Sequence, residues 1–207
     1  SSGWRIESLL KHAWKEAGLT GGDQKIHFLI DEDDEEEYTA LYVASGAEAN
    51  GCKTKICKMF DEFVWQNGKI VDKEGVEVKT LWKTWMWESA ISDFYKAQKE
   101  REESWVPKDG ERVRLCDLML GKDDTIRVFE PMWKLIPSNK AILPLLWEMF
   151  PGHPNLLRSA WEVTPELTAS GFVRKPIVGR VGSNITVCKP NGETLESSDG
   201  KFGERDM

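Results

Sequence analysis

Residues 25 to 57 read KIHFLIDEDDEEEYTALYVASGAEANGCKTKIC, and this stretch decides the fold. It opens with an apolar run of strand length, followed at once by seven carboxylates at residues 31 to 37. Apolar side chains then recur at helical spacing, with the small Ser45 on the same face: Tyr38, Leu41, Tyr42 and Ala49. Residues 54 to 57 have the composition of a second strand. This strand–helix–strand order predicts a parallel, Rossmann-like piece and an α/β fold of mixed strands and helices.

The seven carboxylates account for the whole net charge of the chain. Its 207 residues carry 28 Lys and Arg against 35 Asp and Glu, a net charge of −7. The chain outside the heptad is therefore electrically neutral, which argues against a nucleic-acid binder, since such proteins cluster basic residues. No window approaches the roughly 20 apolar residues that a membrane span needs. The first residues show no secretory signal, so we expect a cytoplasmic protein that contacts neither nucleic acid nor membrane.

The cysteines and histidines are scattered. Cys52 and Cys57 lie five residues apart, which is not a zinc-binding spacing, and Cys116 and Cys188 have no nearby partner. Four isolated thiols indicate a reducing compartment and make a metal site of the His/Cys type improbable.

The remaining chain contains further short elements. Two short apolar runs on either side of Asn67-Gly68 predict a hairpin over residues 63 to 71, and a further strand is expected at residues 76 to 82. Apolar spacing predicts a helix from Trp87 to Ala97, and the turn residues 107 to 110 suggest a lobe boundary. Other strands are expected at 126–129, 172–177 and 185–188, and a helix capped by Ser138 or Asn139 and carrying Pro144 at 142–150. Trp82, Trp85 and Trp87 could form an aromatic platform, but their spacing is more typical of core packing.

Two basic features could hold a phosphate. Residues 175 to 184, KPIVGRVGSN, place Gly179 and Gly182 three apart with Lys175 and Arg180 beside them, a combination of amides and cations that suits a polyphosphate. The loop is neither a Walker A nor a G-x-G-x-x-G motif, and its composition alone favours an ordinary glycine-rich turn. Lys140 lies at a predicted helix start, where a cation opposes the helix dipole unless an anion is present.

Three stretches resemble the glutathionylspermidine synthetase family, whose synthetase domain is an ATP-grasp ligase. They are FEPMWKLIPSNKAILPLLWEMF at 129–150 with PGHPN at 151–155, the loop at 175–184, and LWKTWMWE at 81–88. The resemblance covers most of residues 4 to 207, strongly after about residue 80. It implies a ligase that uses ATP and Mg²⁺ to activate a carboxylate as an acyl phosphate and then forms an amide with an amine. The implied substrates are a small glutathione-like or peptide-like acid and a spermidine-like amine.

The resemblance also implies roles for individual residues. Lysines matching Lys140 and Lys175 contact ATP, and the loop around Val181 and Gly182, with Gly179 and Arg180, covers its phosphates. Many relatives carry an acid where this chain has Val181, so we expect the loop to close differently here.

The acidic heptad has three interpretations. It can be a solvated helix start, worth about 0.3–1 kcal/mol per carboxylate at best, although seven like charges also repel one another. A metal site is a weaker interpretation, because contiguous acids on one turn point in different directions. Binding of a polycation is the third, since the family presents acids toward spermidine at the place that Glu35 and Glu36 match.

The resemblance marks the chain as a central segment of a longer synthetase. The family's Mg²⁺ ligands lie upstream of the matched region, and its ATP-grasp cleft is closed by residues downstream. We therefore expect a Rossmann-like substrate-side segment at residues 1–85, part of an ATP-grasp domain at 86–207, and no activity for the segment alone. The alternative is a non-catalytic module, derived from an ATP-grasp domain, that binds an amine or a partner protein.

Overall fold

The computed structural model describes residues 2–121, 125–179 and 182–200. The chain divides into two compact units, unit 1 at Ser1–Met132 and unit 2 at Trp133–Met207. These compact units differ from the expected domains at residues 1–85 and 86–207, because the strand at residues 127–129 pairs with the sheet of unit 1. The assignment of those two ranges to a substrate-side segment and an ATP-grasp portion stays a prediction, and each unit is described by itself.

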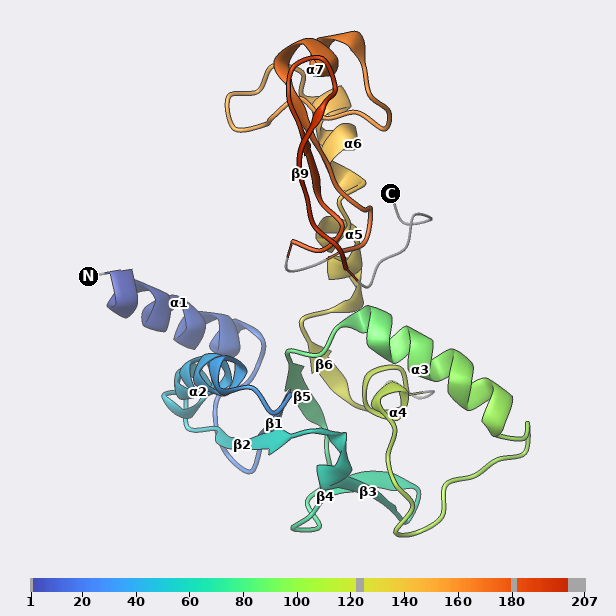
Figure 1. The fold of residues 1–207 in the computed structure, drawn as a ribbon. Helices are drawn as coiled ribbons and strands as arrows, with labels where there is room; N and C mark the ends of the chain where they lie inside the picture. The colour runs from blue at the N-terminus through green and yellow to red at the C-terminus, as the bar shows by residue number, and fades with distance from the viewer. Residues whose placement is uncertain (1, 122–124, 180–181, 201–207) are drawn as a thin grey trace. The chain divides into compact units, whose positions relative to one another are not determined.

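A four-stranded parallel sheet organises unit 1 (Figure 1). Its strand order is β2 (Lys53–Lys58), β1 (Lys25–Ile30), β5 (Thr80–Lys83) and β6 (Arg127–Phe129). Helix α2 (Asp34–Glu48) connects β1 to β2, which confirms the predicted parallel strand–helix–strand piece and the α/β class. From β1 the chain continues to β2, which pairs on one side of β1, and β5 later pairs on the other side of β1. The direction in which strands are added to the sheet therefore reverses between β1 and β5.

Two helices cover one face of this sheet. Ile26, Phe28 and Ile30 of β1 are fully buried against α2 and against α1 (Ser2–Glu16). The Trp14 ring of α1 packs on Phe28 at 6.1 Å, and its indole N–H donates to the Val43 carbonyl of α2 at 3.0 Å. Each large apolar side chain buried in this way contributes about 1.5–3 kcal/mol, so this face forms a substantial part of the core.

Helix α2 turns its small residues toward the sheet. Ala40, Ala44 and Ala47 are buried, and a Cβ at Gly46 would lie 2.9 Å from the Cβ of Leu10 on α1. The apolar stripe recognised in the sequence faces the other way, since its larger members are 42–74% exposed: Tyr38, Leu41 and Tyr42. Close packing of the two helices requires small side chains on the buried side, which explains the inversion.

Unit 1 continues with a hairpin, whose Phe63 contacts the His27 ring of β1 at 6.0 Å, and with two further helices. Strands β3 (Phe63–Gln66) and β4 (Lys69–Asp72) form the predicted antiparallel hairpin, with Asn67 and Gly68 both at positive φ in its turn. The strand expected at residues 76–82 is shorter and displaced, as β5 covers only Thr80–Lys83. A 3₁₀ turn, η1 (Phe60–Glu62), precedes β3.

Helix α3 (Trp87–Glu100) and the short α4 (Leu115–Met119) are joined by ion pairs. Arg101 makes a bidentate contact with Asp117 at 2.6 and 2.8 Å, and Arg114 donates to Asp93 at 2.6 Å. The turn predicted at residues 107–110 forms, but it marks no lobe boundary, because the Gly110 amide donates to the Trp65 carbonyl of β3 within unit 1.

Unit 2 is built from short elements. The 3₁₀ turn η2 (Met132–Lys134) spans the division between the units, and the helices that follow are α5 (Leu135–Ser138), α6 (Ile142–Met149) and α7 (Pro165–Ser170). The strands β7 (Phe172–Arg174), β8 (Thr186–Cys188) and β9 (Thr194–Ser197) form an antiparallel sheet in that order. The predicted turn between β8 and β9 forms at Asn191 and Gly192, both at positive φ.

Candidate functional site

Lys140 and the glycine loop lie together in unit 2. The Lys140 backbone amide donates to the Ile177 carbonyl at 2.9 Å, and its side-chain amine donates to the Gly179 carbonyl at 2.5 Å. These two bonds fix the start of α6 against the chain that leaves β7. Residues that are 39 positions apart in sequence are therefore brought to one place, as a common phosphate site requires.

The predicted cap of α6 is partly correct. The Asn139 side-chain oxygen accepts from the Ala141 amide at 2.9 Å, so Asn139 organises the turn in which Lys140 sits. The residue directly before the helix is Ala141, which has no capping side chain. Sequence reasoning placed Lys140 at the helix start, and the structure places it two residues before Ile142.

Lys175 lies directly after β7 and is exposed. The next residue, Pro176, is fully buried, so the backbone carrying Lys175 is held while its amine reaches solvent. Gly182 has φ +71°, a conformation that favours glycine, and its carbonyl accepts from the Ser198 hydroxyl at the end of β9. Arg180 and Val181, the two remaining loop residues of the prediction, lie outside the described residues.

The acidic heptad begins α2 in unit 1. The Asp33 side chain caps the helix by accepting from the amides of Glu35 at 2.8 Å and Glu36 at 3.1 Å. Glu37 pairs with Lys58 at 2.6 Å. Because several of the seven carboxylates have structural partners, the helix-start interpretation of the heptad holds for those residues.

Glu35 and Glu36 differ in their surroundings. Glu36 is half-buried, and its carboxylate accepts from the Asp31 amide at 3.0 Å and from the Thr84 hydroxyl. Glu35 is exposed and leaves its carboxylate toward solvent. Thr84 follows β5 directly, and its amide donates to the Leu29 carbonyl of β1 at 3.1 Å.

This pair of loops lies where the strand order reverses. Ligands of open parallel α/β sheets bind outside the carboxyl ends of the strands at such a reversal. Sequence reasoning missed Thr84 as a partner of Glu36, although its position directly after a strand was a usable signal. The sequence did not reveal that β1 and β5 are neighbouring strands. Their pairing brings Glu36, which follows β1, close to Thr84, which follows β5.

A buried charge cluster near the hairpin was also missed. Asp72 of β4 accepts from Lys25 at 3.0 Å, from Lys55 at 3.1 Å and from the His27 ring at 3.1 Å. Lys25 and Lys55 also pair with Glu74, at 2.9 and 3.1 Å. The visible signal was the period-two placement of Lys25, His27 and Lys55 on neighbouring strands, which puts them on one face of the sheet.

Two groups in this cluster have shifted pKa values. Burial alone would raise the pKa of the Asp72 carboxyl, but hydrogen bonds from the Val76 amide, Lys25, His27 and Lys55 outweigh it and hold that pKa well below its usual range. Burial lowers the pKa of His27, and the Asp72 carboxylate only partly opposes this effect. The cluster therefore combines a neutral histidine with an ionised aspartate.

The tryptophans near β5 pack as expected for a core. Trp82 and Trp87 are 8% and 6% exposed, and Trp85 contacts Phe60 edge-on at 5.7 Å. The Trp87 indole donates to the Glu130 carbonyl at 2.8 Å, and its ring lies 4.9 Å from the amine of Lys83. The core interpretation is confirmed for Trp82 and Trp87.

The thiols are all free and buried: Cys52, Cys57, Cys116 and Cys188. Burial raises the pKa of Cys57 and Cys116 to about 12, so neither is a reactive thiolate at neutral pH. Within residues 2–121, 125–179 and 182–200, His, Cys, Asp and Glu side chains form no group of three able to hold a metal ion. None of the helices described here is both long and apolar enough to span a bilayer.

Comparison with known proteins places these features in a family. Residues 4–207 match the sequence model of the glutathionylspermidine synthase pre-ATP-grasp region. The chain is 55% identical over all 207 residues to a trypanothione synthetase of Crithidia fasciculata, of which it covers 31%. It is 40% identical over 185 residues, 87% of its length, to the bifunctional glutathionylspermidine synthetase/amidase of Escherichia coli K12, of which this covers 29%. The chain is also 34% identical, over 80% of its length, to a glutathionylspermidine synthase of C. fasciculata, and the match covers 24% of that relative. The chain thus spans less than a third of each of these relatives.

Proposed function

The chain belongs to the glutathionylspermidine synthase family, and from that membership we propose that it is part of an ATP-dependent carboxylate–amine ligase. When bound, ATP would supply the γ-phosphoryl group that turns the carboxylate of the acid substrate into an acyl phosphate and would leave as ADP; the amine would then attack the acyl carbon and displace inorganic phosphate, which gives the amide. The names of the relatives support glutathione-like acids and spermidine-like amines as the substrate classes. The residues of this chain bind and orient these groups.

The proposed ATP site consists of Lys140, Lys175 and the loop from Gly179 to Gly182, including Arg180 and Val181. The observation that carries this proposal is the pair of hydrogen bonds from Lys140 to the carbonyls of Ile177 and Gly179. These bonds hold the Lys140 cation against the glycine loop, which begins at Lys175. Such cations would neutralise phosphate charge as the γ-phosphoryl group moves. Neither lysine acts as a nucleophile in this proposal.

The chemistry of the donors fits a polyphosphate. A lysine amine combines a positive charge with N–H donors, which are the groups that a phosphate oxygen accepts from, and the bond from Lys140 to Gly179 places this amine at the loop. Lys175 is exposed on a backbone that the buried Pro176 holds in place, so its amine can meet a ligand without unfolding the strand. Among the described residues no His, Cys, Asp or Glu group could hold a metal, so we expect any Mg²⁺ that the reaction requires to be held by residues outside this segment.

The proposed amine site is the carboxyl edge of the sheet between β1 and β5. Glu36 is held by Asp31 and Thr84, while Glu35 is exposed one residue away. A held and an exposed carboxylate on one helix start would suit an extended cation with several separated charges. The net charge of −7 supports this assignment, because it equals the charge of the seven carboxylates at residues 31 to 37 and the rest of the chain is neutral.

Binding of an ATP analogue by the natural polypeptide tests the nucleotide site. Lys175→Ala should weaken binding by tenfold or more, about 1.4 kcal/mol, because it removes a charge-assisted contact to phosphate. Lys140→Ala should weaken binding and also lower the melting temperature, because it releases the loop from α6. The matched control is Lys189→Ala, an exposed lysine of unit 2 paired with Glu193. Unchanged affinity in Lys175→Ala would sink the phosphate-site assignment.

Spermidine titration tests the amine site. Changing Glu35 and Glu36 together to Gln should weaken spermidine binding and leave ATP-analogue binding unchanged, since the two proposed sites lie in different units. The control with the same charge change is Glu7→Gln with Glu16→Gln, two exposed acids on α1. Equal loss of affinity in both pairs would indicate a general charge effect and exclude a specific site.

The proposal also concerns what residues 1–207 do alone. We expect no ATP-dependent amide formation by this segment, because phosphoryl transfer needs the metal that other residues hold. Turnover by the isolated 207 residues would contradict this expectation. If the natural polypeptide itself lacks carboxylates that could bind Mg²⁺, the proposal of a non-catalytic module that binds an amine or a partner takes its place.

A further inference from the structure

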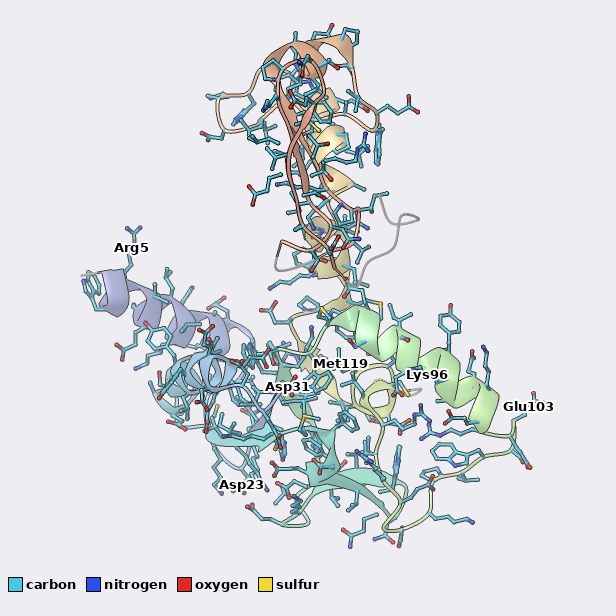
Figure 2. All side chains as sticks on the ribbon, viewed as in Figure 1. Arg5, Asp23, Asp31, Lys96, Glu103 and Met119 are labelled. Carbon is cyan, nitrogen blue, oxygen red and sulfur yellow. The ribbon has the colours of Figure 1, made fainter. Side chains whose placement is uncertain are left out.

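The serine that follows β9 joins the two ends of the turn that ends the glycine loop. Strand β9 pairs with β8 in the sheet of unit 2 (Figure 1), and Figure 2 draws the side chains of this sheet. The Ser198 hydroxyl donates to the Gly182 carbonyl at 2.5 Å and accepts from the Ile185 amide at 3.0 Å. A hydroxyl has one proton and two lone pairs, so both bonds can exist together. The Ser198 amide also donates to the Ile185 carbonyl at 2.9 Å, which continues the pairing of β9 with β8.

The chain remains against the same turn two residues later. A Cβ on Gly200 would collide with the Cβ and the hydroxyl of Ser183 and with the side-chain oxygen of Asn184. The backbone can approach these side chains so closely because glycine has no Cβ. Residues 198–200, which we call the post-β9 segment, therefore contact the turn at residues 182–185 through a serine hydroxyl and through a glycine backbone.

The glycine loop is thus held by two elements that are distant in sequence. On the side of β7, the Lys140 amine donates to the Gly179 carbonyl, 39 positions away. On the side of β8, the Ser198 hydroxyl donates to the Gly182 carbonyl, 16 positions away. Donor groups that are in place before a ligand arrives bind it more tightly, because less conformational entropy is lost on binding. The contacts on both sides of the loop can therefore contribute to affinity without touching the ligand.

We propose that Ser198 and Gly200 are positioning residues for the terminal phosphates of the nucleotide. They hold the turn at residues 182–185, and with it the end of the glycine loop, so that backbone amides of the loop are presented to phosphate oxygens. This inference rests on the proposed nucleotide site. Ser198 acts through its bonds to the turn, and Gly200 acts by leaving room for the side chains of the turn. Substitutions outside the loop should consequently weaken binding of the phosphates and leave binding of the rest of the nucleotide unchanged.

Titration of the natural polypeptide with a non-hydrolysable ATP analogue and with AMP tests the role of Ser198. Ser198→Ala removes both hydroxyl bonds and should weaken analogue binding roughly three- to tenfold, the size of about one neutral hydrogen bond. AMP lacks the two terminal phosphates, so its affinity should not change. Ser198→Thr keeps a hydroxyl at this exposed position and should restore analogue binding. The control is Ser197→Ala, at the adjacent exposed serine of β9, which should leave both affinities unchanged.

Gly200→Ala gives a second test that does not involve the hydroxyl. Its Cβ would displace side chains of the turn and should weaken analogue binding roughly tenfold or more. The control is Gly192→Ala, which strains the β8–β9 turn through a positive φ, meets no atom within 4 Å, and should lower the melting temperature without changing analogue affinity.

The outcomes separate this inference from the nucleotide site on which it rests. If Lys175→Ala weakens analogue binding while Ser198→Ala and Gly200→Ala match their controls, the nucleotide site stands and the positioning role is overturned. Equal losses of analogue and AMP affinity in Ser198→Ala would show a purely structural contact and would also overturn it. If Lys175→Ala leaves analogue binding unchanged, the nucleotide site and the positioning role are both wrong.

Discussion

Unit 1 and unit 2 differ in how much of their apolar side-chain surface they bury. Unit 1 packs aromatic and aliphatic side chains on both faces of its parallel sheet, with Phe28, Phe63 and Leu81 fully buried. Among the described residues of unit 2, only Pro144, Pro176 and Cys188 are buried, while Leu157 and Met149 are 88% and 68% exposed. The same chain thus contains one region that forms its own core and one whose described apolar residues are mostly exposed. Stability and the proposed nucleotide contacts are consequently properties of different regions.

Separating the units at residue 132 should give the largest effect. Residues 1–132 should unfold cooperatively on heating, because the sheet and both of its covering layers lie in this fragment. Residues 133–207 should show no cooperative transition, because a chain of this size without a core cannot offset its conformational entropy. Circular dichroism and calorimetry of the two fragments measure this directly. A sharp calorimetric transition in residues 133–207 would remove the contrast between the units.

Truncating one apolar side chain in each unit should reproduce the contrast within the intact chain. Phe28→Ala should lower the free energy of unfolding by about 3–5 kcal/mol, because it leaves a cavity between the rings of Trp14 and Trp82. Leu157→Ala should change that free energy by no more than about 0.5 kcal/mol, since the side chain is almost fully exposed. Urea unfolding followed by tryptophan fluorescence gives both values. Equal losses would show that unit 2 is more tightly packed than its exposure indicates.

Lowering the pH should weaken unit 1 selectively. The folded-state pKa of His27 lies below its unfolded value, so the unfolded chain binds a proton first, and stability falls as pH drops below about 6.5. The depressed pKa of Asp72 adds a second loss of stability below about pH 4. Asp72→Asn should cost about 2–3 kcal/mol at pH 7 and remove the second loss.

The measurement is urea unfolding of residues 1–207 between pH 3 and pH 8. Glu196→Gln serves as the control, because Glu196 is an exposed acid on β9 of unit 2. A pH profile of Asp72→Asn that matches the unaltered chain would contradict the assigned role of Asp72. So would an equal shift in the control variant.

Two glycines should give the smallest effects, and for different reasons in the two units. Gly46→Ala in unit 1 should cost about 1–2 kcal/mol, because its new Cβ meets Leu10 at 2.9 Å and helix propensity only partly compensates. In unit 2, a Cβ at Gly182 would meet no atom within 4 Å, so Gly182→Ala should lower the free energy of unfolding by about 1 kcal/mol through the positive φ alone. Urea midpoints measure the first, and ATP-analogue affinity is the sensitive readout for the second. A larger stability loss at Gly182 would mean that its loop is part of a packed structure.

Much of the fold could be predicted because its signals are local. The apolar run at Lys25–Ile30 is β1, Asn67-Gly68 turns a hairpin, and β1–α2–β2 has the expected parallel order. The orientation of α2 was less visible, because Ala40 and Ala44 form a weaker hydrophobic signal than Tyr38 and Leu41, which face solvent. Periodicity identifies a helix, but the closeness of the neighbouring helix decides which side is buried.

The candidate sites could be predicted residue by residue but not as arrangements. Lys140, Lys175 and the glycine loop came from the resemblance to the family, whereas the bond from Lys140 to Gly179 joins segments that no local pattern links. The same holds for Thr84 with Glu36, and for Asp72 with Lys25 and Lys55. These contacts depend on which strands are neighbours, and strand order is a long-range property of the sheet.

The strand order also has a consequence for the kinetics of folding. β1 and β2 are joined by one helix, and their paired residues Lys25 and Lys53 lie 28 positions apart in the sequence. The β5–β6 pairing closes a larger loop, because its paired residues Thr80 and Arg127 lie 47 positions apart. Contacts between residues far apart in sequence form more slowly because they require the closure of larger loops. During synthesis, β1, α2 and β2 can assemble early as a nucleus, and β6 completes the sheet only after residue 129 has left the ribosome. The outermost strand on the β5 side is therefore also the last strand of the sheet to arrive.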